Sequence, residues 1–224
     1  MTNPIFKLLT PLKSAAFSIA ATAALTMAAN AQNVFITQDL PFFEFDNGYE
    51  FFSIERDQNN EARIPDGFAK TSRPCPPFCI QPMVVAQGVE TLGELELLAF
   101  LDEYVQTQTG ALIDARLESW YRGGTIPGSV NFAFNLFEDP KNNPFLVPVL
   151  EILGGVRDSD GVWDFSDALD LALFCNGPWC GQSPRAIRNL ISVGYPPEKL
   201  RYYRGGMQAW LALGMSVYVP EGGT

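Results

Sequence analysis

The chain has 224 residues, of which 25 are acidic and 15 are basic, and its formal net charge is −10. It contains no histidine, which excludes Ser-His-Asp triads, Cys-His dyads and histidine-based metal sites. An acidic protein without a basic stripe is a poor candidate for binding nucleic acid or an anionic membrane surface. We therefore expect neither partner, and a reactive thiol must be activated by backbone dipoles or by Arg and Lys.

Residues 1–31 have the pattern of a cleavable signal peptide. Lys7 and Lys13 precede an alanine-rich apolar run, and residues 29–31 form an Ala-Asn-Ala cleavage site. A transmembrane anchor is the alternative, but the run is short and weakly apolar beside the ~20 apolar residues that a membrane span needs. We expect cleavage after Ala31 and a periplasmic or secreted protein without membrane contact.

Residues 32–90 are interpreted as an N-terminal extension, separate from a main domain at 91–224. A β-hairpin is predicted where the apolar runs 42–45 and 49–54 flank an Asp-Asn-Gly turn. The segment 73–82, RPCPPFCIQP, is a proline-rich turn that carries two cysteines. Two alternatives stay open for it. In the first, a disulfide makes it a rigid linker between the hairpin and the main domain. In the second, it folds over the loop that carries Cys175 and supplies a wall of the site or a partner thiol.

From residue 88 onward, predicted strands alternate with predicted helices. This order indicates an α/β fold with a parallel sheet and helices on both faces. A helix is expected over 88–106, with Thr91 as its N-cap and Glu94 completing a capping box. The later elements are a strand over 111–115, a short helix with an aromatic pair at 120–121, a Gly-Pro turn at 123–130, a helix over 143–154 and a polar excursion over 155–166.

The most informative stretch of the sequence is 171–207. Its continuous apolar run 171–174 predicts a strand covered on both faces, and Cys175 stands at the end of that strand. Ser183 then opens a helix that ends at Gly194. A thiol at the carboxyl end of a parallel strand, facing a helix N-terminus, lies where open α/β sheets bind ligands.

The four cysteines form two local pairs, Cys75 with Cys79 and Cys175 with Cys180. In an exported protein such cysteines indicate disulfides, and the sequence leaves three connectivities open. A four-cysteine zinc site is the alternative, although its ligands are usually separated by two residues rather than by three or four. We expect no metal and no cofactor.

Two regions of the sequence resemble the signatures of rhodanese homology domains. Residues 111–130, ALIDARLESWYRGGTIPGSV, resemble the first signature, a strand ending in Asp and Arg, an aromatic residue and a G-x-I-P-G turn. The strand and loop at 171–183, the pair Gly-Tyr at 194–195 and YRGGMQAW at 203–210 resemble the second. The resemblance covers about residues 92–215. The CPPFC and CNGPWC loops further resemble an exported bacterial subgroup of this family.

The resemblance implies a rhodanese-like fold and persulfide chemistry, in which a cysteine takes sulfane sulfur from a donor and passes it to a nucleophile. The family spacing from Ser183 to Gly194 favours Cys175 over Cys180 as that cysteine. The loop is then two residues longer than usual, with Gln182 where the family has an arginine that helps to hold anionic donors. Backbone N–H groups and the helix dipole would stabilise a persulfide anion without histidine.

Three functions stay open from the sequence: a periplasmic sulfurtransferase in which Cys180 resolves the Cys175 persulfide, a dithiol redox protein that uses both thiols, and a non-catalytic binding module. The partner is a small sulfur-donor anion or an exported thiol protein. Asp114 is interpreted as structural, and Trp179 as a loop plug or a substrate platform. The candidate substrate-binding residues are Gly177, Trp179, Gly181, Gln182, Ser183, Arg185 and Arg116.

Overall fold

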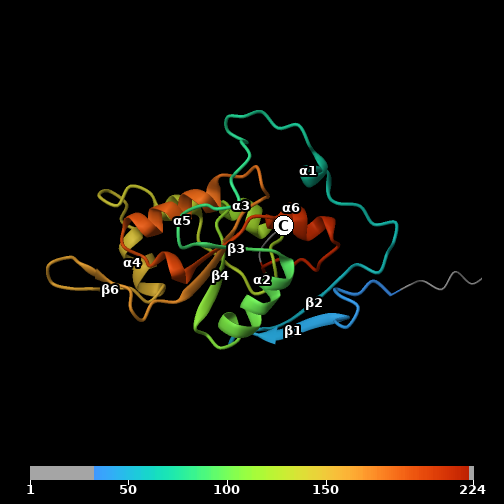
Figure 1. Cartoon of the computed structure of the whole chain (residues 1–224), viewed down its shortest axis with the longest axis horizontal. Helices are drawn as coiled ribbons and strands as arrows, with labels where there is room; N and C mark the ends of the chain where they lie inside the picture. Colours follow the sequence, from blue (N-terminus) through green and yellow to red (C-terminus); the bar gives the residue numbers. More distant parts are fainter. Residues whose placement is uncertain (1–32, 222–224) are drawn as a thin grey trace, which may run out of the picture. The chain divides into compact units, whose positions relative to one another are not determined.

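The computed structural model describes residues 33–221 (Figure 1). The predicted signal peptide lies outside these residues. Within 33–221, no helix is long and apolar enough to cross a membrane.

A five-stranded parallel sheet forms the centre of the described chain. Its strands are β3 (Glu90–Leu92), β4 (Gly110–Asp114), β5 (Val130–Asn131), β8 (Asp170–Phe174) and β9 (Leu200–Tyr203). They run in the order β3-β9-β8-β4-β5, and every neighbouring pair is parallel. Phe174 lies opposite both Asp114 and Tyr203. The three central strands therefore end at the same level, and the segments that follow them meet at the carboxyl end of the sheet.

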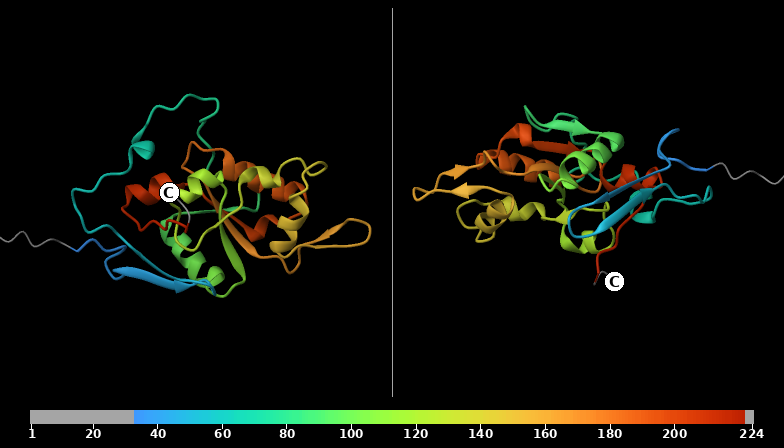
Figure 2. Two further views of the ribbon diagram at one scale, coloured as in Figure 1. Left: turned by 180° about the vertical axis from the view of Figure 1, so that it is seen from behind. Right: turned by 90° about the horizontal axis from the view of Figure 1, so that it is seen from below.

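The central strand β8 is buried on both faces, as its apolar run predicts. Leu171 and Leu173 belong to one core cluster, whereas Ala172 and Phe174 belong to the other, because successive side chains of a strand point to opposite faces. Helices cover both faces (Figure 2). The first cluster includes α4 (Leu146–Ile152) and α5 (Gln182–Ser192), and the second includes α2 (Glu94–Phe100), a π-helical turn (Leu101–Val105) and α6 (Gly206–Ala212).

The predicted start of the first helix is wrong. Thr91 is not an N-cap but lies in β3, where it pairs with Tyr202 of β9 and donates a hydrogen bond to the carbonyl of Met83. The helix begins after Gly93, and Glu96 accepts the Gly93 N–H at 3.1 Å. The capping box therefore exists, but Gly93 and Glu96 form it, two residues after the predicted positions. The edge strand before it has three residues and is too short to show an alternating pattern.

Other predicted elements occur with small shifts in their bounds. The strand expected over 111–115 is β4, and the helix expected over 143–154 is the shorter α4. Helix α5 begins at Gln182, one residue before Ser183, and Gly194 follows its end with a φ of +100°. The remaining elements are α1 (Asp66–Ala69), α3 (Glu118–Arg122), 3₁₀ turns at Phe134–Phe137 and Pro197–Lys199, and a small hairpin of β6 (Val156–Arg157) and β7 (Trp163–Asp164).

The predicted N-terminal hairpin is confirmed, but it is not a separate appendage. Strands β1 (Phe42–Asp46) and β2 (Phe51–Glu55) pair in antiparallel register around the Asp-Asn-Gly turn. Phe45, Phe52 and Ile54 are buried in the same cluster as α2 and α6. The alternating apolar residues of the hairpin thus complete one face of the domain core, which joins the beginning of the extension to the parallel sheet.

The chain between β2 and β3 is mostly irregular and passes α6 on its way back to the sheet (Figure 1). Its single helical turn, α1, buries Phe68. Gln208 of α6 donates a hydrogen bond to the Phe68 carbonyl at 2.9 Å, and the Phe68 ring contacts Trp120 edge-on. These contacts hold the extension at the carboxyl end of the sheet, where the second cysteine pair lies.

Candidate active site

The second cysteine pair lies in the loop between β8 and α5, at the carboxyl end of the central strand. Backbone hydrogen bonds fix the base of this loop to the start of α6: Met207 donates to the Cys175 carbonyl and Gln208 to the Asn176 carbonyl, both at 3.0 Å. Gly206 adopts a φ of +55°, and a Cβ atom there would lie 2.2 Å from the Cys175 carbonyl oxygen. The Gly-Gly turn therefore lets α6 approach the loop closely.

The Cys175 thiol is buried, with only 2% of the residue exposed. Burial raises the pKa of Cys175, but a hydrogen bond from the Cys180 thiol and one from the Ser183 hydroxyl act against it. Together with the backbone N–H groups of Gly177 and Ser183, they lower the pKa to about 7. By distance and angle the buried Ser183 hydroxyl has no hydrogen-bond partner among residues 33–221, so its proton is available to the Cys175 sulfur. Cys175 is therefore substantially a thiolate at neutral pH, and that thiolate is the nucleophilic form of cysteine.

Cys180 has the opposite character. Its hydrogen bond to Cys175, its burial and the negative charge on Cys175 raise the pKa of Cys180 well above its usual value. Its Sγ also lies 3.5 Å from Oε1 of Gln182. Both cysteines are free thiols in the structure. The Sγ of Cys175 also lies 3.3 Å from the Cys180 carbonyl oxygen, which can accept the proton of the neutral Cys175 thiol. The pair therefore combines a Cys175 thiol of lowered pKa with a Cys180 thiol of raised pKa.

A pocket of about 370 Å³ opens beside this loop. Cys180 lines it and Cys175 does not. Four aromatic residues and two arginines are among the residues that line it: Phe78, Trp120, Phe134, Trp179, Arg73 and Arg185. A concave, largely apolar site with a few placed polar groups suits a small ligand, and a ligand in this pocket would meet Cys180 before Cys175.

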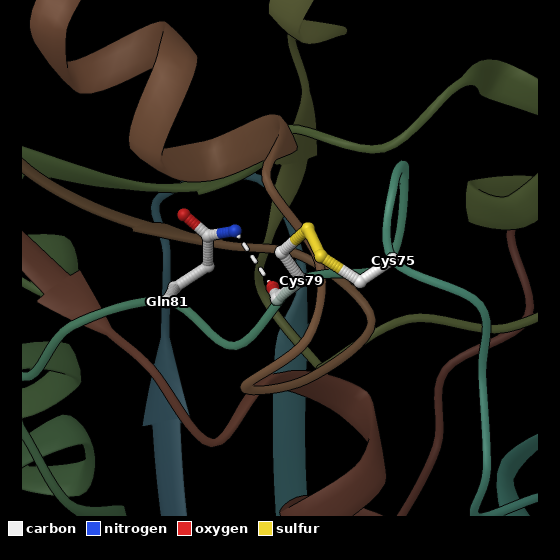
Figure 3. The surroundings of a disulfide bond; sticks show 3 residues. All are labelled: Cys75, Cys79 and Gln81. Atoms are coloured by element: carbon white, nitrogen blue, oxygen red, sulfur yellow. Dashed lines mark hydrogen bonds between the residues drawn. A yellow bond between two sulfur atoms is a disulfide. The ribbon is translucent and has the colours of Figure 1, made fainter.

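The proline-rich turn of the extension forms one wall of the pocket, so the second alternative for it is confirmed. Cys75 and Cys79 form a disulfide (Figure 3). Gln81 donates to the Cys79 carbonyl through its side chain and to the Pro178 carbonyl through its backbone, both at 2.8 Å. The turn supplies no partner thiol to the second pair in this structure, because its two cysteines are bonded to each other.

The predicted site residues cluster closely, with one exception. Trp179, Gly181, Gln182 and Arg185 line the pocket, while Gly177 and Ser183 surround the Cys175 sulfur. Trp179 is a wall of the pocket, held by a 2.8 Å hydrogen bond from its Nε1 to Gln208.

Arg116 is the exception, because it is buried and does not line the pocket. It is 1% exposed, forms an ion pair with Asp114 and donates to the Gly124 carbonyl at 2.7 Å. Its Nη1 also lies 3.4 Å from Oδ1 of Asn176. Its donors therefore bind Asp114, Gly124 and Asn176 inside the protein, and Arg116 supports the loop through Asn176.

Four pocket residues outside the loop were not predicted individually: Arg73 and Phe78, whose segment 73–82 was only an alternative wall, and Trp120 and Phe134. Two of them precede the sheet, and the other two lie between β4 and α4. No local pattern links these positions to the loop. The cysteine turn was the one available signal, because a stapled segment in an exported protein has a fixed shape and can form a wall.

Residues 96–213 match the family model of the rhodanese-like domain. No curated protein matches the chain. Among solved structures, a protein of unknown function from Rhodopseudomonas palustris, described as a possible tyrosine phosphatase, is 21% identical, with a TM-score of 0.42 over 60% of this chain and 88% of that one. Thiosulfate sulfurtransferase from Pseudomonas aeruginosa is 19% identical (TM-score 0.38; 58% and 20% covered). A human single-domain sulfurtransferase is 21% identical (TM-score 0.35; 57% and 97% covered).

Proposed function

This chain belongs to the rhodanese-like domain family, and we propose that it is an exported sulfurtransferase that carries sulfane sulfur as a persulfide on Cys175. The observation that carries this proposal is the environment of the Cys175 sulfur. Hydrogen bonds from Cys180, Ser183 and backbone N–H groups lower its pKa to about 7 in spite of burial. The same donors suit the terminal sulfur of a persulfide, which is also an anion.

In the loading step, the Cys175 thiolate attacks the outer sulfur of a donor such as thiosulfate. A bond forms between Sγ and the transferred sulfur, and the sulfur–sulfur bond of the donor breaks. Its electron pair leaves with sulfite, so charge is conserved and no further oxidant is needed. The N–H group of Gly177 in the loop and that of Ser183 in the first turn of the 11-residue helix α5 would stabilise the persulfide that remains.

Cys180 has two roles in this proposal. As a neutral thiol it donates a hydrogen bond to the Cys175 thiolate, which keeps the nucleophile charged. It also lies between the pocket and Cys175, so its side chain must rotate aside before a donor reaches the nucleophile. After loading, the Cys180 thiol passes its proton to the outer sulfur of the persulfide, and the resulting thiolate attacks Sγ of Cys175 and breaks the persulfide bond. That attack forms a Cys175–Cys180 disulfide and releases hydrosulfide, and an external dithiol then reduces the pair.

A dithiol redox protein is the second candidate function. The observation that favours it is a pair of free, buried cysteines in one loop, with the Cys175 Sγ 3.3 Å from the Cys180 carbonyl oxygen and their pKa values displaced in opposite directions. Such a pair also suits thiol–disulfide exchange with another exported protein. In that case the two cysteines cycle between dithiol and disulfide, and no sulfane sulfur is ever bound.

Peptide mass spectrometry of the chain, purified without reductant and treated with thiosulfate or polysulfide, separates the two candidates. The proposal predicts one added sulfur atom on Cys175, which cyanide removes as thiocyanate. A reversible Cys175–Cys180 disulfide without added sulfur would favour the redox function instead. A bridge that is always present and resists mild dithiol would contradict both and leave a binding module.

A further inference from the structure

Arg73 of the N-terminal extension lies on the active-site loop. Its guanidinium carbon is 3.8 Å from the centroid of the Trp179 ring and 5.8 Å from that of Phe78. These two rings also contact each other edge-on at 5.6 Å. A guanidinium stacked on aromatic faces is fixed in orientation, and its N–H groups remain directed outward in the plane of the group.

Arg73 brings a positive charge that has no counter-ion at the pocket. The loop itself, residues 176–182, has no charged side chain. The other pocket arginine, Arg185, forms an ion pair with Glu138. Arg73 forms no ion pair with any carboxylate of residues 33–221, and one of its nitrogens donates to the Gly67 carbonyl. Its positive charge is therefore available to a ligand.

The Nε atom of Arg73 is buried and has no hydrogen-bond partner among the described residues. A buried donor without a partner is costly and rare in folded proteins, and a bound ligand is one way to satisfy it. The whole chain carries a net charge of −10, so an anion approaching it needs a local positive group. A guanidinium that lines the pocket, has no carboxylate partner among residues 33–221 and keeps one donor without an acceptor provides that group.

The position of Arg73 is fixed by neighbouring contacts. The Cys75–Cys79 disulfide follows it directly in the chain. Beyond the disulfide, Gln81 donates to the Pro178 carbonyl of the loop, and Arg204 donates to the Gln81 carbonyl at 3.0 Å. Because the segment that follows Arg73 is held by the disulfide and by these hydrogen bonds, little of its conformational entropy remains to be lost when a ligand binds.

The pocket is also too large and too apolar for an inorganic anion alone. Its volume of about 370 Å³ lies in the range of sites for organic ligands, and four aromatic side chains line it. A small oxyanion at Arg73 would leave the rings of Trp120 and Phe134 in contact with water. An organic anion with an apolar body would cover these rings as well as pair with the guanidinium.

We propose that Arg73 is the anion-binding residue of the sulfur-donor site and that the donor is an organic sulfur anion, of the thiosulfonate class, with an apolar body. The inference rests on the sulfurtransferase function proposed above. In the reaction, the Cys175 thiolate bonds to the outer sulfur of the thiosulfonate. The sulfur–sulfur bond of the donor breaks, and its electron pair leaves on the sulfinate, so two negative charges enter and two remain.

The first test measures anion recognition without sulfur transfer. Cys175 of the full chain is alkylated with iodoacetate, an anion, and with iodoacetamide, its neutral counterpart, and peptide mass spectrometry gives both rate constants. Arg73→Gln is expected to lower the ratio of the iodoacetate rate to the iodoacetamide rate about tenfold. Arg63→Gln removes the same charge from an exposed position of the same segment and is expected to leave the ratio unchanged. Equal ratios in the two variants would overturn the role of Arg73.

The second test measures the donor itself. Sulfur loading of Cys175 is followed with benzenethiosulfonate, methanethiosulfonate and thiosulfate. The half-saturating concentration should be lowest for benzenethiosulfonate, and Arg73→Gln should raise it about tenfold or more while changing the limiting rate at most about twofold. Arg73→Lys keeps the charge and should restore part of the loss.

The possible failures are distinguishable. Loading that prefers thiosulfate, or that responds equally to Arg73→Gln and Arg63→Gln, would overturn this inference and leave the sulfurtransferase function intact. No added sulfur from any of the three donors, together with an alkylation ratio that depends on Arg73, would overturn the sulfurtransferase function. It would also overturn the thiosulfonate donor, while Arg73 would keep its role as an anion-binding residue.

Discussion

The two cysteine pairs of this chain have nearly the same spacing, yet they are in opposite chemical states. Cys75 and Cys79 form a disulfide in an irregular, largely exposed turn. Cys175 and Cys180 are free thiols, buried between a strand and a helix. The first pair gives shape to the wall of the pocket, and the second pair provides its reactive group.

The surroundings of the sulfur atoms account for this difference. Around the first pair the backbone is fixed by proline and by a few hydrogen bonds to the loop, so a covalent bond adds rigidity where secondary structure is missing. Around the second pair, the end of β8 and the start of α5 already fix the backbone. There the hydrogen bonds change the ionisation of the thiols instead: they lower the pKa of Cys175, and the hydrogen bond between the two thiols raises that of Cys180.

The largest effect is expected from removing the reactive sulfur. Cys175→Ser should reduce sulfur acceptance from thiosulfonate or thiosulfate below detection, because serine is not ionised at neutral pH. The matched control replaces the other pair, Cys75→Ser with Cys79→Ser, and should retain loading at saturating donor. Mass spectrometry of the loaded chain measures both. Loading that survives in Cys175→Ser would assign the sulfur to Cys180.

The second largest effect is expected at the buried Arg116–Asp114 ion pair next to the Cys175–Cys180 loop. The Cys75–Cys79 turn has no comparable ion pair among the described residues. Arg116→Ala leaves the buried carboxylate of Asp114 unpaired, which should lower the free energy of unfolding by about 3–5 kcal/mol. Arg122→Ala is the control, since its ion pair with Glu118 is exposed and should contribute at most about 1 kcal/mol. Urea denaturation measures both. Equal losses in the two variants would contradict a supporting role for Arg116.

Removing the Cys75–Cys79 disulfide should lower the stability of the protein without changing the ionisation of Cys175. Cys75→Ser with Cys79→Ser should lower the free energy of unfolding by about 2 kcal/mol, the value for closing so short a loop. Because the disulfide does not contact the Cys175 sulfur, the pKa of Cys175 should stay near 7. Denaturation and pH-dependent alkylation measure the two quantities. A displaced Cys175 pKa would show that the two pairs are electrostatically coupled.

A smaller effect is expected when the proton donor is removed from the reactive pair. Cys180→Ala deletes the strongest of the hydrogen bonds that lower the pKa of Cys175. The pKa should rise toward its usual value, so that alkylation of Cys175 at pH 7 slows about tenfold. Cys180→Ser keeps a donor and should slow the reaction less. Equal rates in the alanine variant and the unmodified chain would remove Cys180 from the activation of Cys175.

The parts of the fold that sequence could predict are those with local signals. The apolar run of β8, the cysteine at its end and the helix that closes at Gly194 each depend on neighbouring residues, and all are confirmed. Thr91 was mispredicted because capping residues also occur in short strands, and only pairing with β9 decides between them.

The residues that line the pocket could be identified only from the tertiary structure. Arg116 follows a strand that ends at the site, but its side chain turns back to Asp114, and nothing in the sequence distinguishes the two directions. Arg73 and Phe78 reach the loop through contacts between segments far apart in the chain. The sequence also does not show which thiol faces the pocket, because that depends on side-chain packing within the loop.

The pH dependence of alkylation is the most direct test of the central claim, that Cys175 is the thiolate and Cys180 holds the proton. Iodoacetamide is applied between pH 5 and pH 10, and peptide mass spectrometry gives a rate for each cysteine. A lowered pKa means that the Cys175 rate rises with pH through a midpoint of about 7, while Cys180 stays unreactive through neutral pH. A Cys175 midpoint near the usual cysteine value, or earlier reaction at Cys180, would contradict the account.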